Sequence, residues 1–262
     1  MTLPTMGVTF RPQLPPERLA DVVAAADEAG VPELWLWEDC FLEGGIATAA
    51  AALARSTRIR VGLGLLPVPL RNPALAAMEI ATLERLAPGR VIAGFGHGVL
   101  DWMGQVGARV ASPLTLLREY VTAVRTLLAG GTVDARGRYV ELRDVALDWP
   151  PAAPPQLVIG ATGPKTLHLA GELGDGVVLT GGTDPDDVRA ARLIIDEGYA
   201  ASGREGRARV TVYVPVDTAE AGLAARLRDR AAAFAAAGAD AVSFEAPADR
   251  PDPLPIIDAL RG

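Results

Sequence analysis

The sequence predicts one α/β domain built as a closed (β/α)8 barrel. Short runs rich in Val, Leu and Ile alternate with longer Ala-, Leu- and Arg-rich segments along the chain, a pattern typical of β–α–β units in a parallel sheet. Eight such units fit into 262 residues, and about 250 residues is a common length for this barrel. Half of the residues are hydrophobic but only 5% are aromatic, as expected where many helices pack on a buried parallel sheet.

The periodicity of apolar residues places each element. We expect strands at 7–10, 33–37, 59–65, 91–96, 156–160, 176–179, 210–216 and 241–244. The first helix shows the pattern that follows each strand: Leu19, Val22 and Ala26 recur at helical spacing, and Gly30 provides a stop. Further helices are expected at 45–54, 73–86, 113–128, 164–173, 185–202, 218–237 and 252–261.

One longer stretch, 130–155, interrupts the repeating units. It contains Gly and Pro clusters and is interpreted as a crossing loop with a short hairpin, because the β–α units resume after it. The competing topology is an open doubly wound sheet. Its dinucleotide-binding form requires G-x-G-x-x-G after the first strand, and residues 9–12 do not provide it. Eight units therefore favour closure into one domain over 1–262.

Composition limits the classes of partner. The net charge is −7 and the basic residues form no cluster, so neither nucleic acid nor an anionic membrane is expected as a partner. The sequence shows no apolar stretch of about 18 residues and no signal-like N-terminus, which favours a cytoplasmic protein. With one cysteine and two histidines, neither a disulfide nor a Cys- or His-rich metal site is expected. Apolar helix faces that do not pack on the barrel would allow a homodimer, but the sequence does not show which surface would form its interface.

In such barrels the functional residues lie on loops that follow the strands' carboxyl ends. This rule selects five loops, which should line one mouth: residues 38–40, 64–67, 96–98, 160–165 and 180–183.

The loop at 160–165 predicts an anion site. Two glycines allow the chain to turn sharply before a helix whose first N–H groups have no intrahelical acceptor, and phosphate is a natural partner of such groups. Lys165, the chain's only lysine, ends this loop. The alternative is that Gly163 and Pro164 only turn the chain into the helix.

Four loop side chains are candidates for chemistry. His97, between Gly96 and Gly98, would point into the mouth and could transfer a proton, or it could simply be hydrogen-bonded. Glu38 and Asp39 could act as acid or base if burial raised their pKa values, or they could be solvated loop residues. Cys40 is more consistent with packing than with nucleophilic catalysis.

Two tryptophans, Trp37 and Trp102, would form walls of an apolar pocket, although core packing explains them almost equally well. Asp184, by contrast, is expected only to cap a helix.

Several segments in order resemble the bacterial luciferase-like superfamily, especially its deazaflavin (coenzyme F420) dependent oxidoreductases. The matching segments are 34–39, 62–67, 71–76, 83–90, 94–98, 160–167 and 170–176. The resemblance implies a compact luciferase-like TIM barrel with the cofactor at the mouth, and a non-proline cis peptide around residues 64–66 behind its ring. It further implies contact with the cofactor by Gly64, Leu65, Leu66, Gly96, His97, Gly160, Ala161, Thr162, Gly163, Pro164, Lys165, Gly181 and Gly182. Glu38, Asp39 and His97 would lie near the ring or the substrate, and Trp37, Cys40 and Trp102 would line the substrate pocket.

This chain departs from the family pattern in two ways. Many relatives carry histidine after the strand-two acidic residue, where this chain has Cys40, so the proton donor does not carry over directly. The chain is also short, so insertions that often cover the mouth are reduced. An F420-dependent hydride transfer to or from an organic substrate is the principal hypothesis. The alternatives are an FMN-dependent monooxygenase and a non-catalytic barrel that binds a phosphorylated metabolite or cofactor; metal-assisted hydrolysis is disfavoured by the few His residues.

Overall fold

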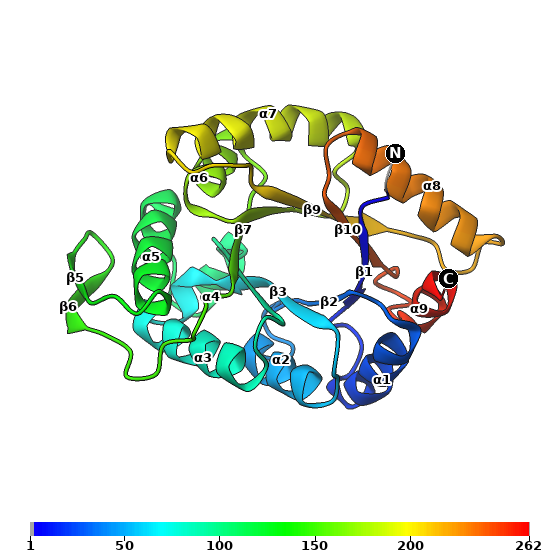
Figure 1. The fold of residues 1–262 in the computed structure, drawn as a ribbon, viewed down its shortest axis with the longest axis horizontal. Helices are drawn as coiled ribbons and strands as arrows, with labels where there is room; N and C mark the ends of the chain where they lie inside the picture. The colour runs from blue at the N-terminus through cyan, green and yellow to red at the C-terminus, as the bar shows by residue number, and fades with distance from the viewer. Residues whose placement is uncertain (1–2, 262) are drawn as a thin grey trace.

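A computed structural model describes residues 3–261 of the chain. In this region eight parallel strands close into a barrel in the order β1-β10-β9-β8-β7-β4-β3-β2 (Figure 1). The predicted (β/α)8 barrel is therefore confirmed, and each predicted strand is present within a few residues of its expected position. The barrel strands are β1 (Thr5–Phe10), β2 (Glu33–Leu36), β3 (Arg60–Pro67), β4 (Val91–Gly96), β7 (Gln156–Gly160), β8 (Gly176–Leu179), β9 (Arg209–Pro215) and β10 (Ala241–Glu245).

Helices form a ring around the barrel (Figure 1). Two of them differ from the sequence-based prediction: α8 begins at Leu223 rather than at residue 218, and the short helix α4 was not anticipated. The helices are α1 (Leu19–Ala29), α2 (Gly45–Ala54), α3 (Pro73–Leu86), α4 (Leu100–Gln105), α5 (Pro113–Leu128), α6 (Pro164–Leu173), α7 (Pro185–Ala201), α8 (Leu223–Ala236) and α9 (Leu254–Leu260), with 3-10 turns η1 (Pro16–Arg18) and η2 (Val68–Leu70).

The stretch after α5 contains the expected hairpin. Strands β5 (Val133–Arg136) and β6 (Glu141–Val145) pair antiparallel and project beside α5, outside the barrel (Figure 1). The Glu119 carboxylate on α5 accepts hydrogen bonds from the backbone N–H groups of residues 138–140. A helix side chain thus fixes the hairpin turn.

Local sequence signals set the helix boundaries. Gly30 ends α1 with φ of 72°, a left-handed conformation that glycine adopts without steric cost. Asp184 caps α7 by accepting from the N–H groups of Asp186 and Asp187, as the sequence predicted.

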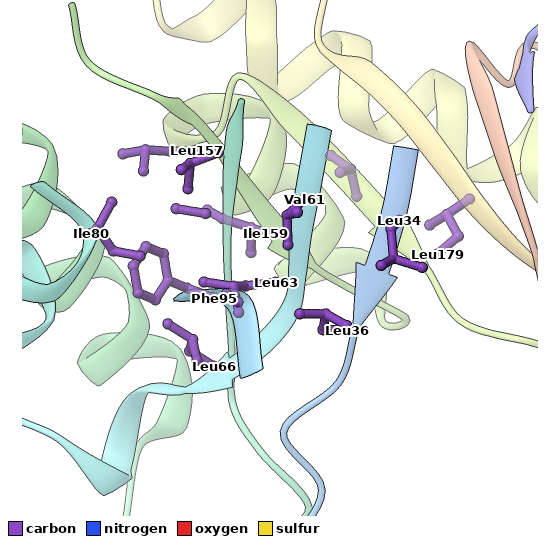
Figure 2. Close-up of a cluster of buried hydrophobic side chains, with 14 of the residues drawn as sticks. Leu34, Leu36, Val61, Leu63, Leu66, Ile80, Phe95, Leu157, Ile159 and Leu179 are labelled. Atoms are coloured by element: carbon purple, nitrogen blue, oxygen red, sulfur yellow. The ribbon is translucent and has the colours of Figure 1, made fainter. Parts of the chain in front are cut away.

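Alternation along the strands separates two apolar layers. One set of side chains packs between the strands and the surrounding helices; Figure 2 shows members of this set from β2, β3, β4, β7, β8 and α3. The other set fills the barrel interior and consists of Trp35, Ile92, Val158, Val178 and Tyr213. Because successive residues face opposite sides, this alternation also decides which residues can reach the mouth.

The amino-terminal end of the barrel is closed by a buried charged cluster. Glu33 on β2 lies 3.1 Å from an Arg60 nitrogen and 2.8 Å from an Arg209 nitrogen. The Trp35 indole N–H donates to the same carboxylate at 3.2 Å. This end is filled by side chains, so a ligand must approach from the carboxyl ends of the strands.

Candidate active site

A cavity of about 530 Å³ opens over the carboxyl ends of the strands. This volume is within the range of about 300–1,000 Å³ that is usual for small-molecule sites. All five predicted loops contribute to its wall. The lining residues are Trp37, Glu38, Asp39, Gly64, Leu65, Pro67, His97, Gly98, Val99, Trp102, Gly160, Ala161, Thr162, Thr166, Val178, Thr180, Gly181 and Tyr213.

The wall of the cavity on β3 is a bulge. The Gly64–Leu65 peptide bond is cis, where the family resemblance placed it, and the pairing of β3 with β4 shifts register between Leu63 and Leu66. The Tyr213 hydroxyl donates to the Gly64 carbonyl oxygen at 3.2 Å. A Cβ atom on Gly64 would overlap this hydroxyl, so only glycine fits here. A second cis bond, Cys40–Phe41, was not anticipated.

The bulge turns the Leu66 side chain to the opposite face of the strand from the one that simple alternation predicts. Simple alternation from Gly62 and Gly64 would turn Leu66 inward, but the register shift places Leu66 in the outer layer and Leu65 in the interior. Leu65 lies against Gly160 on β7, and a Cβ on Gly96 of β4 would come within 2.5 Å of it. Gly96 therefore makes room for Leu65 and does not itself line the cavity.

His97 lines the opposite part of the cavity. Its Nε2 atom lies 3.2 Å from the Thr166 hydroxyl oxygen on α6. Its Nδ1 atom is buried and has no hydrogen-bond partner among the described residues. Burial lowers the pKa of His97, and the Pro113 carbonyl partly opposes this effect. At neutral pH the ring is therefore an uncharged imidazole at the cavity wall, with the Thr166 hydroxyl and the Pro113 carbonyl as its polar neighbours.

We expect His97 to titrate below about 6.5, the value of an unperturbed histidine. Because the folded-state pKa lies below the unfolded-state pKa, the unfolded chain binds more protons as the pH falls through this window. The free energy of unfolding should then decrease as the pH is lowered, and His97→Gln should reduce that decrease. Imidazole NMR resonances, assigned with this variant against His168, give the midpoint directly. A midpoint above 6.5 would contradict the assigned environment.

Asp39 is the carboxylate best placed for proton transfer. It lines the cavity, and burial raises its pKa while the positive charge of Arg11 opposes the increase. A carboxyl group with a raised pKa can hold or release a proton nearer to neutral pH.

Glu38 reaches the cavity wall, but both of its oxygens are engaged elsewhere. Arg71 donates to them at 2.6 and 3.0 Å, and the Gly45 N–H donates at 2.8 Å. The carboxylate therefore ties the loop after β2 to α2 and to the segment before α3. This differs from the acid or base role that the sequence suggested.

The predicted pocket residues fall into two groups. Trp37 and Trp102 line the cavity, and Trp37 packs on Tyr213 with ring centres 5.4 Å apart. Cys40 is half-buried but is not part of the wall. Burial, Glu38 and Asp39 all raise the pKa of its thiol. Cys40 thus stays protonated at neutral pH, which does not favour a nucleophilic role.

Only part of the predicted phosphate loop lines the cavity. Gly160, Ala161 and Thr162 line the cavity, whereas Gly163, Pro164 and the exposed Lys165 lie beyond its wall on the first turn of α6. Gly163 caps α6 without a side-chain hydrogen bond, so the first N–H groups of this helix have no capping side chain. Gly181 also lines the cavity, but Gly182 does not.

Sequence reasoning missed two important wall residues. Tyr213 lies in the interior because it alternates with the outward-facing Val212 and Val214, a signal that strand periodicity contained. Thr166 lies within the segment 160–167 that resembles the family, and its position in the first turn of α6 was the available signal.

Within residues 3–261, no group of three or more His, Cys, Asp and Glu side chains could hold a metal ion. No helix in that same segment combines the length and the apolar character needed to cross a membrane.

The chain is similar to known proteins over most of its length. The 5,10-methylenetetrahydromethanopterin reductase of Archaeoglobus fulgidus is 32% identical over 207 residues, which cover 79% of this chain and 61% of that protein. The F420-dependent glucose-6-phosphate dehydrogenase of Kineococcus radiotolerans is 33% identical over 219 residues, which cover 77% of this chain and 64% of that protein. This chain thus spans less than two thirds of the length of these curated relatives.

Structural similarity supports the same relationship at the level of the fold. The coenzyme F420 dependent tetrahydromethanopterin reductase from Methanopyrus kandleri aligns with a TM-score of 0.84 at 19% identity, over 99% of this chain and 98% of that one. The pattern of the luciferase-like monooxygenase family matches residues 2–253. The chain belongs to the luciferase-like monooxygenase family.

Proposed function

We propose that this protein is an oxidoreductase that binds F420 and transfers a hydride between this cofactor and a small organic substrate. The observation that carries the proposal is the cavity at the carboxyl ends of the strands, walled by the Gly64–Leu65 bulge and continuous with the glycine loop at 160–162. The choice of cofactor is supported by two similar proteins that depend on F420, the glucose-6-phosphate dehydrogenase and the tetrahydromethanopterin reductase described above.

The residues present fit such a cofactor. Gly64, Gly98, Gly160 and Gly181 all line the cavity, so bare backbone can approach a flat ring closely. The start of α6, with no capping side chain, provides N–H groups for a phosphate. The His97 imidazole lines the same cavity, where it can form a hydrogen bond with a ligand. The bound deazaflavin would supply the hydride chemistry.

The protein's own residues would bind the cofactor, orient the substrate and exchange protons with them. Leu65 would support one face of the ring, and His97, held by Thr166, would donate or accept a hydrogen bond at the ring or the substrate. Asp39, raised in pKa by burial, would hold or receive the proton that accompanies hydride transfer. Lys165, exposed on the first turn of α6, would meet the acidic part of the cofactor outside the cavity.

The substrate we propose is an uncharged organic molecule. Trp37, Val99 and Trp102 give the cavity apolar walls, and the exposed side chains of Phe41 and Leu42 follow Asp39 on the loop after β2. An acidic, apolar site of this kind favours a neutral ligand, because an anion would meet the Asp39 carboxylate. The net charge of −7 supports small molecules over nucleic acid as partners. We further propose that this barrel domain is located in the cytoplasm, and the homodimer stays a prediction.

Separate titrations with F420 and with FMN test the cofactor assignment. We expect tryptophan fluorescence to be quenched by F420 at micromolar concentration, because Trp37 and Trp102 line the cavity. Binding of FMN alone would transfer the protein to the monooxygenase reaction that gives the family its name. Binding of F420 with no reduction or reoxidation by any donor or acceptor would instead indicate a non-catalytic barrel.

A further inference from the structure

The bulge in β3 places a buried backbone carbonyl outside the regular sheet register. Strand β3 pairs with β2 as far as Leu63, and its register with β4 breaks after Leu63 and resumes at Leu66. Gly64 and Leu65, which both line the cavity, lie in this interruption, and Gly64 is buried. Because a bulge disrupts the ladder, a buried carbonyl there needs a donor from elsewhere. The geometry of the cavity wall therefore depends on the group that supplies this donor.

Tyr213 on β9 supplies a donor from the far side of the barrel. Its hydroxyl donates to the Gly64 carbonyl oxygen at 3.2 Å. In the barrel order, β3 is separated from β9 by β4, β7 and β8 on one side and by β2, β1 and β10 on the other. The hydrogen bond therefore crosses the interior between opposite strands. Tyr213 is only 4% exposed, so water competes little for this carbonyl.

Two tryptophans hold the Tyr213 ring in place. The edge of Trp35 packs against it with ring centres 5.8 Å apart, and Trp37 packs on it at 5.4 Å. Both tryptophans are themselves fixed, because the Trp35 indole N–H donates to Glu33 and the Arg11 guanidinium lies 4.9 Å from the centre of the Trp37 ring. The donor thus comes from a rigid aromatic cluster beneath the cavity.

We propose that Tyr213 is a positioning residue whose hydroxyl, acting through the Gly64 carbonyl, holds the β3 bulge in the geometry that receives the cofactor ring. Leu65, the next residue along the bulge, is the side chain assigned to support one face of that ring. The part that concerns the cofactor rests on the proposed function. The hold of Tyr213 on the bulge exists in the protein without cofactor.

Tyr213 also lines the cavity, but its hydroxyl is not an acid in the reaction. Burial raises the pKa of Tyr213 well above its ordinary value, so the phenol stays protonated near neutral pH. Its single O–H is directed at Gly64. Loss of the hydroxyl should therefore change the fit of the cofactor and leave the pH dependence of F420 binding unchanged.

Tyr213→Phe removes the donor and keeps the ring between the two tryptophans. The buried Gly64 carbonyl then lacks this partner, which favours other geometries of the bulge. An apparent Kd rises in inverse proportion to the fraction of protein in the binding-competent geometry. We expect the Kd for F420 to rise about tenfold. The measurement is a titration of tryptophan fluorescence, since Trp37 and Trp102 line the cavity.

Two control variants separate positioning from general stability. Tyr120→Phe removes the hydroxyl of another buried tyrosine, which has no hydrogen-bond partner among the described residues. Ser243→Ala removes a buried hydrogen bond of 2.8 Å to Thr9 inside the barrel, away from the cavity wall. We expect Ser243→Ala to lower the thermal midpoint and neither control to change the Kd. An equal loss of affinity in Ser243→Ala and Tyr213→Phe would overturn the proposal.

The bulge itself is observed by NMR on cofactor-free protein. Glycine labelled with carbon-13 at the carbonyl and leucine labelled with nitrogen-15 give signals only from Gly–Leu pairs, which occur at 62–63, 64–65 and 222–223. Leu65→Met assigns the Gly64 signal by removing it. This signal should move in Tyr213→Phe and stay in place in Tyr120→Phe. An unchanged Gly64 signal, or an unchanged Kd, in Tyr213→Phe would contradict the proposal.

A second pair of variants guards against a Tyr213→Phe protein that does not fold. At position 213, p-fluorophenylalanine fills the volume of the hydroxyl without donating, whereas p-aminophenylalanine donates an N–H. Tighter F420 binding by the amino variant would support the proposal, and equal affinities would overturn it. If the unaltered protein bound no F420, the proposed function would be contradicted, and a Gly64 signal that moves in Tyr213→Phe would leave the hold of Tyr213 on the bulge standing.

Discussion

Replacing Gly64 with alanine should weaken F420 binding and lower stability together. The added methyl group would overlap the Tyr213 hydroxyl, which donates to the Gly64 carbonyl. Adding a group to a packed site costs about 1–3 kcal/mol of stability. The overlap could be relieved only by a shift of the backbone bulge that forms the cavity wall. We expect at least a tenfold weaker Kd, equivalent to about 1.4 kcal/mol or more, measured by fluorescence titration beside the thermal midpoint.

The matched control for this substitution is Gly44→Ala. Gly44 precedes α2 with φ of −77°, and nothing lies within 4 Å of the position that its Cβ would take. Alanine should therefore leave both cofactor affinity and the thermal midpoint close to those of the unaltered protein. Unchanged F420 affinity in Gly64→Ala would separate the bulge from the cofactor site and contradict the assignment.

Replacing Arg71 with methionine should cause the largest loss of stability among the variants considered. Arg71 holds the Glu38 carboxylate with two hydrogen bonds and lies 3.4 Å from Glu79. Its side chain is 16% exposed and that of Glu38 is 9% exposed, so two carboxylates would be left together with little water. Removing one partner of a buried pair costs about 3–5 kcal/mol, and urea unfolding should show a loss of about 3 kcal/mol.

Two further variants make this result specific. Arg143→Met removes an ion pair whose arginine is 77% exposed and should change the free energy of unfolding by less than about 0.5 kcal/mol. Combining Arg71→Met with Glu38→Gln should recover part of the loss, because the unpaired charge is then gone. If Arg71→Met were as stable as the Arg143 control, Glu38 would be free for proton transfer and its structural role would be wrong.

The fold could be predicted because it depends on periodicity. Leu34 and Leu36 face outward and Trp35 inward, as strand alternation requires, and Asp184 caps the helix that it precedes. The mouth loops followed from the general rule for such barrels. Tyr213 could have been found by the same alternation, applied to an inward-facing position.

The remaining features depend on contacts between distant segments. The direction of Leu66 depends on the β3 bulge, which simple alternation does not predict. The role of Glu38 depends on Arg71, 33 residues away in the sequence. Glu245 and Arg11 are separated by nearly the whole chain and meet only because the barrel closes between β10 and β1. No local pattern indicated which carboxylates would be neutralised and which would remain available.

A crystal structure of the protein with bound F420 tests the central assignment most directly. We expect density for the deazaflavin ring against Gly64 and Leu65, within reach of His97, with the phosphate at the first N–H groups of α6. Density for the ring elsewhere on the surface, or a cavity still filled by protein side chains in the presence of saturating F420, would contradict the site.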